Sequence, residues 1–279
     1  SNSHGAEGTD AQTLTSFDSD GFTTGNSRAT GGDSGNKMVA WNWKAGSSAS
    51  SNSNGSITSS VSANTTAGFS IVSYTGNGSQ PSTVGHGLGV TPDVVLVKPR
   101  SIAYSWCMYH KSSGNTKLLY LDTNGGEGGS SVWNNTSPTS SVFTVNDNQV
   151  NKSGETHIAY CFAEKPGYSK FGSYTGNGNA DGTFIYTGFK PAWVMIKTTD
   201  SSHNCRIHEA VRNPNNVIGK GLEADTSDVE YDNVNLDFNS NGFKIRTTTN
   251  AHNASGGTYI YMAFGQSLVG SNNVPCTAR

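Results

Sequence analysis

The chain has 279 residues, of which 34 are glycine and only 14% are charged, and its formal net charge is −2. This length leaves room for two or three domains, and the shortage of long charged helix formers beside many β-branched and turn-forming residues predicts an all-β protein. The sequence has no basic stripe that would favour nucleic acid, and no apolar run reaches the roughly 18–20 residues that insertion across a membrane requires.

The first 46 residues predict a closing β-hairpin followed by one further strand. Residues 13–17 and 22–24 are expected to pair, and residues 37–44 alternate like a strand with two different faces. The hairpin pattern Phe-x-Ser-x-Gly-Phe returns at residues 238–243. We therefore expect residues 1–46 to be the closing hairpin of an incomplete preceding repeat. Because the chain begins without Met, we also expect a fragment of a longer protein or a product cut from a precursor.

The turn of this hairpin contains the candidate metal ligands Asp18 and Asp20. Asp-Ser-Asp-Gly has the look of a calcium loop, but the twelfth position, which an EF-hand fills with a bidentate Glu, is Ala29. The sister turn at residues 239–242 is Asn-Ser-Asn-Gly, which keeps the turn residues and loses both charges. An Asx-type turn is therefore the favoured interpretation, and we predict no metal and no other cofactor.

Residues 47–67 are rich in Ser, Asn and Gly and predict a linker carrying one short strand at most. Residues 68–166 follow as the first β-sandwich repeat. In it, residues 93–98 are apolar on both faces, which is expected of a strand covered on both sides. The predicted strands of this repeat are residues 69–74, 93–98, 105–110, 118–121, 140–145 and 156–163.

One hexapeptide, Ser-Tyr-Thr-Gly-Asn-Gly, occurs at residues 73–78 and again at residues 173–178, 100 positions later. Further matches follow at offsets of 99 and 98, which is the drift expected of a duplicated domain with small loop deletions. The matches at an offset of 98 are Cys107 with Cys205 and His110 with His208.

These matches predict tandem, duplicated β-sandwich domains, jelly-roll-like and of about 100 residues each. The second repeat is residues 167–269, and residues 270–279 form a C-terminal tail. A single short helix is expected at residues 217–223, and Asp181-Gly182 is a hairpin-turn signal. The predicted strands are residues 168–174, 182–186, 193–197, 205–209, 236–238, 242–247 and 258–264.

Catalytic motifs are absent from the sequence, so we predict that the protein is not an enzyme. There is no nucleophile elbow, no zinc-protease motif and no P-loop. Asp122 and Glu127 flank a Gly-rich loop, and the acidic run at residues 223–232 is interpreted as a solvated loop. His110 and His208 are interpreted as structural histidines. The cysteines have neither metal-ligand nor disulfide spacing and are expected to be small buried residues: Cys107, Cys161, Cys205 and Cys276.

Aromatic residues in polar loops are the candidates for binding a sugar. Tyr104 and Trp133 could stack against the face of a sugar ring, and Asn124, Asn134 and Asn135 could hydrogen-bond its hydroxyls. The alternative for Trp133 is that it caps the end of a sandwich core.

Four motifs together resemble the repeated C-terminal β domains of marine bacteriophage tail-fibre-like virion proteins. They are the hexapeptide, Val-Gly-His-Gly-Leu-Gly-Val-Thr-Pro at residues 84–92, Ile-Ala-Tyr-Cys-Phe-Ala-Glu at residues 158–164, and Pro-Cys-Thr-Ala-Arg at residues 275–279. The resemblance covers most of residues 13–279.

This resemblance implies a structural and adhesive protein of a bacteriophage appendage, a tail fibre or spike on the virion surface. It implies extracellular exposure, a homo-oligomer, most simply a trimer, and contact with other virion proteins and with host-surface glycans or another receptor. The alternatives are a secreted bacterial surface or carbohydrate-binding protein and, third, a depolymerising enzyme.

Overall fold

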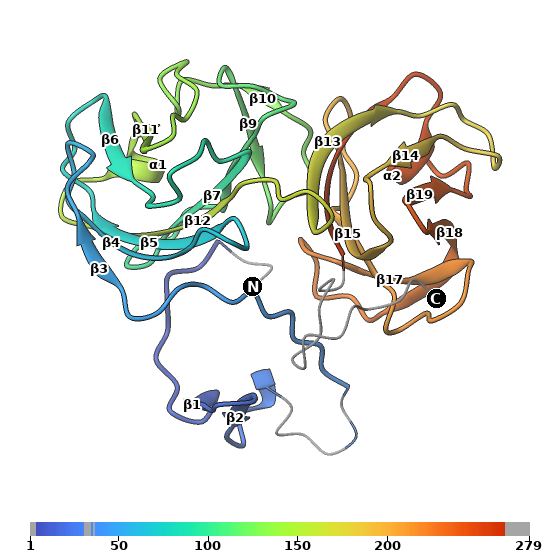
Figure 1. Cartoon of the computed structure of the whole chain (residues 1–279), viewed down its shortest axis with the longest axis horizontal. Coiled ribbons are helices and arrows are strands. Elements are labelled where there is room, and N and C mark those ends of the chain that lie inside the picture. The colour runs from blue at the N-terminus through green and yellow to red at the C-terminus, as the bar shows by residue number, and fades with distance from the viewer. Residues whose placement is uncertain (1–3, 31–34, 36, 266–279) are drawn as a thin grey trace.

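The computed structural model describes residues 4–30, 35 and 37–265, and within them the protein is all-β. Two β bodies lie side by side, and the N-terminal segment runs below them (Figure 1). We call residues 50–162 the first body and residues 169–265 the second body. The helical elements in this part of the chain are η1 (Arg28–Thr30), α1 (Asn148–Asn151) and α2 (Asn250–Asn253).

The first body is built on an eight-stranded antiparallel sheet with β7 and β12 at its centre. A two-stranded ribbon, β6 (Ser82–Gly85) with β11 (Val142–Val145), contributes the opposite side of the core. The sheet order is β10 (Gly128–Gly129), β9 (Lys117–Tyr120), β8 (Cys107–His110), β7 (Val94–Pro99), β12 (Thr156–Phe162), β5 (Phe69–Thr75), β4 (Ser59–Asn64) and β3 (Ser50–Asn52).

The second body has one eight-stranded antiparallel sheet that curls toward a barrel. Its two edge strands are consecutive in sequence, because the chain passes directly from β13 to β14 (Figure 1). The sheet order is β13 (Ser169–Thr175), β20 (Thr258–Gly265), β15 (Pro191–Thr198), β16 (Arg206–Glu209), β17 (Ile218–Glu223), β18 (Tyr231–Asn239), β19 (Gly242–Ile245) and β14 (Phe184–Tyr186).

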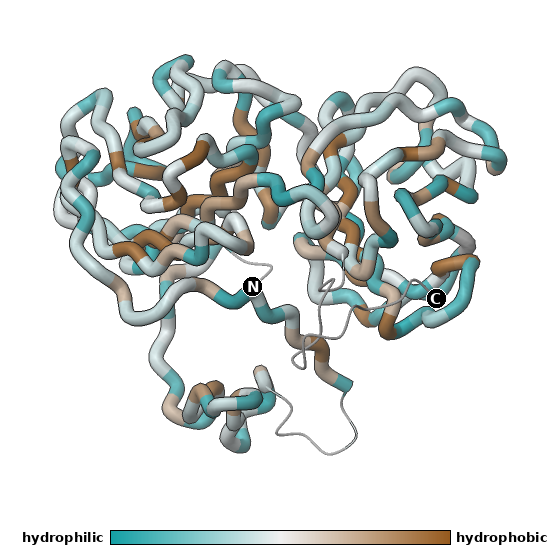
Figure 2. Tube along the Cα trace, in the orientation of Figure 1, coloured by the Kyte–Doolittle hydropathy of each residue, from teal (hydrophilic) through white to brown (hydrophobic). Residues whose placement is uncertain are grey.

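Three hydrophobic clusters hold these sheets together. One fills the first body, one fills the second, and a third lies between the bodies and takes side chains from both, including Phe162 and Phe264. The hydrophobic stretches of the chain accordingly follow the strands, while the loops are hydrophilic (Figure 2). The central strand β7 is buried on both faces, as the pattern at residues 93–98 predicts, because every one of its residues is buried.

The repeated hexapeptide forms the same contacts in both bodies. The Tyr74 hydroxyl donates to the Val150 carbonyl of α1 at 2.6 Å, and the Tyr174 hydroxyl donates to the His252 carbonyl of α2 at 2.7 Å. A Cβ on Gly76 would lie 2.3 Å from the Lys152 carbonyl oxygen, so only glycine lets the chain approach this helix. The hexapeptide is thus a clamp for a one-turn helix.

The structure overturns several sequence predictions of secondary structure. The helix expected at residues 217–223 is absent, because Ile218–Glu223 form the strand β17. Residues 47–67 are not a linker, because β3 and β4 extend the first sheet and bury Ile57 and Val61. Residues 37–44 do not form the expected strand, and Trp41 and Trp43 pack on the cluster between the bodies. Asp181-Gly182 is not a hairpin turn, because β13 and β14 pair with different strands.

The N-terminal hairpin is confirmed as β1 (Leu14–Phe17) paired with β2 (Phe22–Thr24). Phe17 pairs with Phe22 as Phe238 pairs with Phe243 in the second body. The environments differ, because Phe238 and Phe243 are 3% and 0% exposed whereas Phe17 is 82% exposed.

Strand pairing corrects the expected match of Cys107 with Cys205 and of His110 with His208. Cys107 pairs with Val97, one residue before Lys98, and Arg206 pairs with Ile196, one residue before Lys197. The offset at these strands is therefore 99 and not 98. A slip of one residue moves a side chain to the other face of a sheet, so His110 and His208 face different surroundings.

Two buried lysines anchor segments that cross the bodies. Lys98 Nζ donates to the Gly5 carbonyl at 2.8 Å, and Lys197 Nζ donates to the Thr123 carbonyl at 2.7 Å. A backbone hydrogen bond accompanies each lysine contact. The backbone N–H of Glu7 donates to the Arg100 carbonyl, and that of Glu127 donates to the Thr199 carbonyl, both at 2.7 Å. Residues 4–7 thus lie on the first body as residues 123–127 lie on the second.

Cys107, Cys161 and Cys205 are free and fully buried, as predicted, and burial raises the thiol pKa of both Cys161 and Cys205 to about 12. The predicted tail at residues 270–279, with Cys276, lies outside the described residues.

Candidate ligand-binding cavity

The second body contains a polar cavity of about 320 Å³. Small-molecule sites in proteins span roughly 300–1,000 Å³, so this space is large enough for a small polar ligand. Its walls come from β16, β18, the segment after β19, and α2. The lining residues are Arg206, Tyr231, Asn233, Asn235, Thr247, Thr249 and His252.

Arg206 and Tyr231 form one wall. The guanidinium of Arg206 lies over the Tyr231 ring, 4.7 Å from its centroid, and pairs with the Glu223 carboxylate. The Glu223 side chain is only 9% exposed, so the sequence-based interpretation of its acidic run as a solvated loop is wrong at this residue. The Glu223 charge neutralises that of Arg206, and the wall as a whole carries no net charge.

His252 forms the floor and is hydrogen-bonded to a second buried histidine, His208. His208 Nδ1 lies 3.2 Å from the Lys220 carbonyl oxygen, and His208 Nε2 lies 3.0 Å from His252 Nε2. Burial lowers the pKa of His208 to about 4 and, with the nearby His208 and Arg206, lowers the pKa of His252 well below its ordinary value. Both rings are therefore neutral at pH 7 and share one hydrogen bond.

Three polar atoms of the lining residues are buried without a hydrogen-bond partner in the part of the chain that the structure describes: Arg206 Nε, the Tyr231 hydroxyl and His252 Nδ1. An unpaired buried polar group costs roughly 1–3 kcal/mol. All three belong to residues that line one open space.

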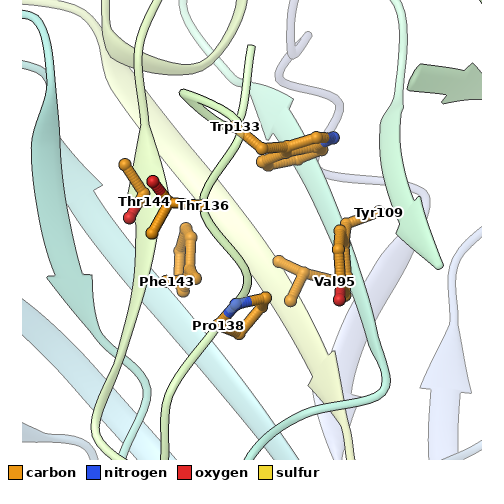
Figure 3. Close-up of a pocket in the computed structure, with 7 residues that line it drawn as sticks. All are labelled: Val95, Tyr109, Trp133, Thr136, Pro138, Phe143 and Thr144. Carbon is orange, nitrogen blue, oxygen red and sulfur yellow. The ribbon is translucent and has the colours of Figure 1, made fainter. Parts of the chain in front are cut away.

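The corresponding place in the first body is packed shut. Cys107 and Tyr109 occupy the strand positions of Arg206 and His208, and Val150 holds the clamped helix position of His252. Beside Tyr109, Trp133 and neighbouring side chains pack together (Figure 3), and no room for a water molecule is left between them.

Trp133 therefore cannot stack on a sugar, and this sequence prediction is corrected. Its side chain is 2% exposed and meets Tyr109 edge to face, with ring centroids 6.1 Å apart. The alternative, in which Trp133 closes the core, describes its position. Asn134 and Asn135, at φ of 51° and 48°, form the tight turn that brings the ring inward.

The other predicted sugar-binding residues are not gathered around Trp133. Tyr104 is half-buried, and Asn124 is exposed on the loop that crosses to the second body. Among the described residues, neither forms a hydrogen bond or ring contact with Trp133, Asn134 or Asn135.

The carboxylate of Asp18 is occupied within its own hairpin. Its oxygens accept hydrogen bonds from Ser16 Oγ at 2.9 Å and Thr23 Oγ1 at 2.8 Å, an arrangement that supports the turn. Over residues 4–30, 35 and 37–265, no group of three or more His, Cys, Asp or Glu side chains could hold a metal ion.

Residues 1–267 match the model of a protein family described as "Domain of unknown function (DUF7483)". The chain belongs to this family. The matched range contains both eight-stranded sheets and the whole cavity, so this architecture lies within the DUF7483 region. No curated protein and no solved structure matches the chain. None of the helices in the described ranges has the length and hydrophobicity that spanning a bilayer requires.

The sequence singled out His208 but missed Arg206, Tyr231 and His252. A signal was present, because polar residues replace apolar ones at matched positions of the two bodies. For Arg206 it emerges only when the strands are aligned with an offset of 99, and for His252, which matches Val150, with an offset of 102.

Proposed function

We propose that the protein is a structural and adhesive component of a bacteriophage appendage, a tail fibre or spike, which binds host-surface glycans through the cavity of the second body. The observation that carries the adhesive part is the cavity itself, with three unpartnered polar atoms where the first body is packed. The resemblance of the repeated motifs to tail-fibre-like virion proteins supports the setting at the virion surface.

We further propose that the two bodies are a tandem duplication of one jelly-roll-like β-sandwich. The strand order β9-β8-β7-β12-β5 of the first body has the same topology as β17-β16-β15-β20-β13 of the second. The ribbon β6–β11 likewise corresponds to β14–β19. The helix clamps also agree. The placement of residues 4–7 on Lys98, like residues 123–127 on Lys197, supports residues 1–46 as the end of an earlier repeat.

A homo-oligomer, most simply a trimer, is part of this proposal, together with contacts to other virion proteins. Among the described strands, β13 pairs only with β20 and β3 only with β4. Such edges are normally paired, covered or blunted by charge, and the chain has only 18 Lys and Arg residues. Assembly around an axis would cover them.

A secreted bacterial surface or carbohydrate-binding protein is the second candidate, because the same cavity would serve it equally well. We propose no catalytic role. The Glu223 carboxylate pairs with Arg206, and the described residues that line the cavity include no other carboxylic acid that could work with the free Nδ1 of His252.

A glycan array with the purified protein tests the adhesive function. We expect binding to at least one class of surface saccharide, and loss of that binding in His252→Val, which introduces the residue found at the matched position of the first body. Tyr104→Ala is the matched control and should bind normally. Binding that survives His252→Val and is lost in Tyr104→Ala would place the site in the loops of the first body. An array without any signal would leave a purely structural role.

A further inference from the structure

We propose that the cavity of the second body selects a neutral saccharide and holds it through two adjacent hydroxyl groups. This inference rests on the proposed glycan-binding function and names the class of ligand. It follows from the hydrogen-bonding character that the surrounding residues impose on each unpartnered atom.

The histidine pair fixes one of these atoms as an acceptor. The Lys220 carbonyl can only accept, so the proton of neutral His208 lies on Nδ1 and donates to it. His208 Nε2 then carries a lone pair and must accept the proton of His252 Nε2. The remaining nitrogen of neutral His252, Nδ1, has no proton. It is a buried acceptor without a donor among the described residues.

The wall formed by Arg206 and Tyr231 supplies a donor. Arg206 Nε carries a proton that nothing in the described part of the chain accepts, because Glu223 pairs with another nitrogen of the same guanidinium. The Tyr231 hydroxyl beside it can donate or accept, and is likewise unpaired. A ligand in this cavity must therefore present a donor to His252 and an acceptor to Arg206.

This pairing discriminates among ligand classes. A carboxylate or sulfate can only accept, so it would satisfy Arg206 but face the lone pair of His252, and the Arg206 charge is already neutralised by Glu223. An ammonium group would satisfy His252 but leave Arg206 Nε unpaired. A pair of neighbouring hydroxyls supplies both partners, and the two threonines and two asparagines of the lining suit further hydroxyls.

Isothermal titration with two panels of saccharides tests the proposal. The neutral panel is methyl α-D-mannopyranoside, methyl β-D-galactopyranoside, methyl α-L-fucopyranoside and N-acetylglucosamine. The acidic panel is glucuronic acid, galactose 6-sulfate and N-acetylneuraminic acid. The acidic sugars carry adjacent hydroxyls as well, but their charge would lie near the Glu223 carboxylate, which already pairs with Arg206. We therefore expect at least tenfold tighter binding from the neutral panel, and at least a tenfold loss of affinity in His252→Val.

Tyr231→Phe keeps the test meaningful if His252→Val folds poorly. It removes a buried hydroxyl that has no partner in the described protein, so thermal stability should hold or rise while affinity for the sugar falls. Imidazole nitrogen NMR gives a second readout. His252 should be the Nε2–H tautomer without ligand, and its Nδ1 resonance should shift when the sugar binds.

The outcomes separate this inference from the proposed function. Acidic sugars that bind in a His252-dependent way, while neutral sugars do not, would overturn the inference and keep the glycan-binding site. A proton on His252 Nδ1 in the free protein would overturn it as well. Failure of both panels, together with a silent glycan array, would overturn the inference and the proposed function together.

Discussion

Replacing Tyr174 by Phe removes one hydroxyl from the clamp that holds α2, and with it the backbone of His252. The ring itself should stay in place, because it stacks on Tyr259 with centroids 5.0 Å apart and is 7% exposed. What is lost is the 2.7 Å hydrogen bond to the His252 carbonyl. Tyr74→Phe makes the same change in the first body, where the 2.6 Å bond ends on the Val150 carbonyl.

The expected cost is the same in both variants, because a buried carbonyl loses its partner in each. Such a loss costs about 1–3 kcal/mol, and each kcal/mol lowers the Tm by roughly 2–4 °C in domains of this size class. The effect on the ligand should differ. Tyr174→Phe loosens a residue of the cavity floor and should weaken saccharide binding several-fold, whereas Tyr74→Phe loosens a helix that lines no cavity and should leave binding unchanged.

Thermal denaturation and titration with the best-bound saccharide measure the two effects side by side. Equal losses of Tm with unequal losses of affinity would support the clamp as the support of the site. If Tyr74→Phe weakened binding as much as Tyr174→Phe, the effect would be a general loosening of the protein. If neither variant melted earlier, the hydroxyl contacts would not contribute to stability and the reasoning would be refuted.

Burial lowers the pKa of His110, which also donates to the Tyr261 carbonyl, from 6.5 to about 4, so the folded protein holds this ring neutral. The stability that the neutral His110 ring contributes should be fully present above pH 6.5, and the free energy of unfolding should fall by about 3 kcal/mol as the pH drops to 4. Urea titrations at several pH values measure this fall, which should be smaller in His110→Gln. Trp43 packs edge to face against Trp193 and Phe264 between the bodies, so Trp43→Ala should cost about 3 kcal/mol in the same titration. Phe17→Ser, at an exposed position, is the control for Trp43→Ala and should change the free energy of unfolding little. Equal losses in the two variants would mean that Trp43 is not packed between the bodies as described. Sedimentation should show a trimer, and a stable monomer at micromolar concentration would contradict the proposed assembly.

The fold class was predictable because composition and the repeated motifs act over the whole chain. The hexapeptide, for instance, marks two places where glycine must approach a helix backbone and a tyrosine must cap it. The two helices themselves were not predictable, since one turn each, at residues 148–151 and 250–253, leaves no periodic pattern. Residues 47–67 misled because short polar strands at a sheet edge have the composition of a linker.

A one-residue error in aligning the two bodies is why Arg206, a residue of the cavity, was missed from the sequence. The sequence alignment matched Cys107 with Cys205 because the two residues are identical. In the sheets, however, Cys107 pairs with Val97 and Arg206 pairs with the equivalent residue Ile196, so Cys107 corresponds to Arg206. Identity of residue type outweighed periodicity in that alignment, although alternation of faces is the stronger physical constraint. Trp133 misled in the opposite way, since a loop rich in Asn and Ser can still turn one large ring into the core.

The lysines that receive the crossing segments have a consequence for how such a chain can diversify. Lys98 and Lys197 grip main-chain carbonyl oxygens, which every residue possesses, and they contact Gly5 in one case and Thr123 in the other. These lysine contacts depend on the path of the backbone and not on side chains, although the Glu7 carboxylate adds an ion pair with Arg100 in the first segment. Mutations can therefore accumulate on the outward side of these segments without loosening their anchorage, so surface character and architecture can evolve independently.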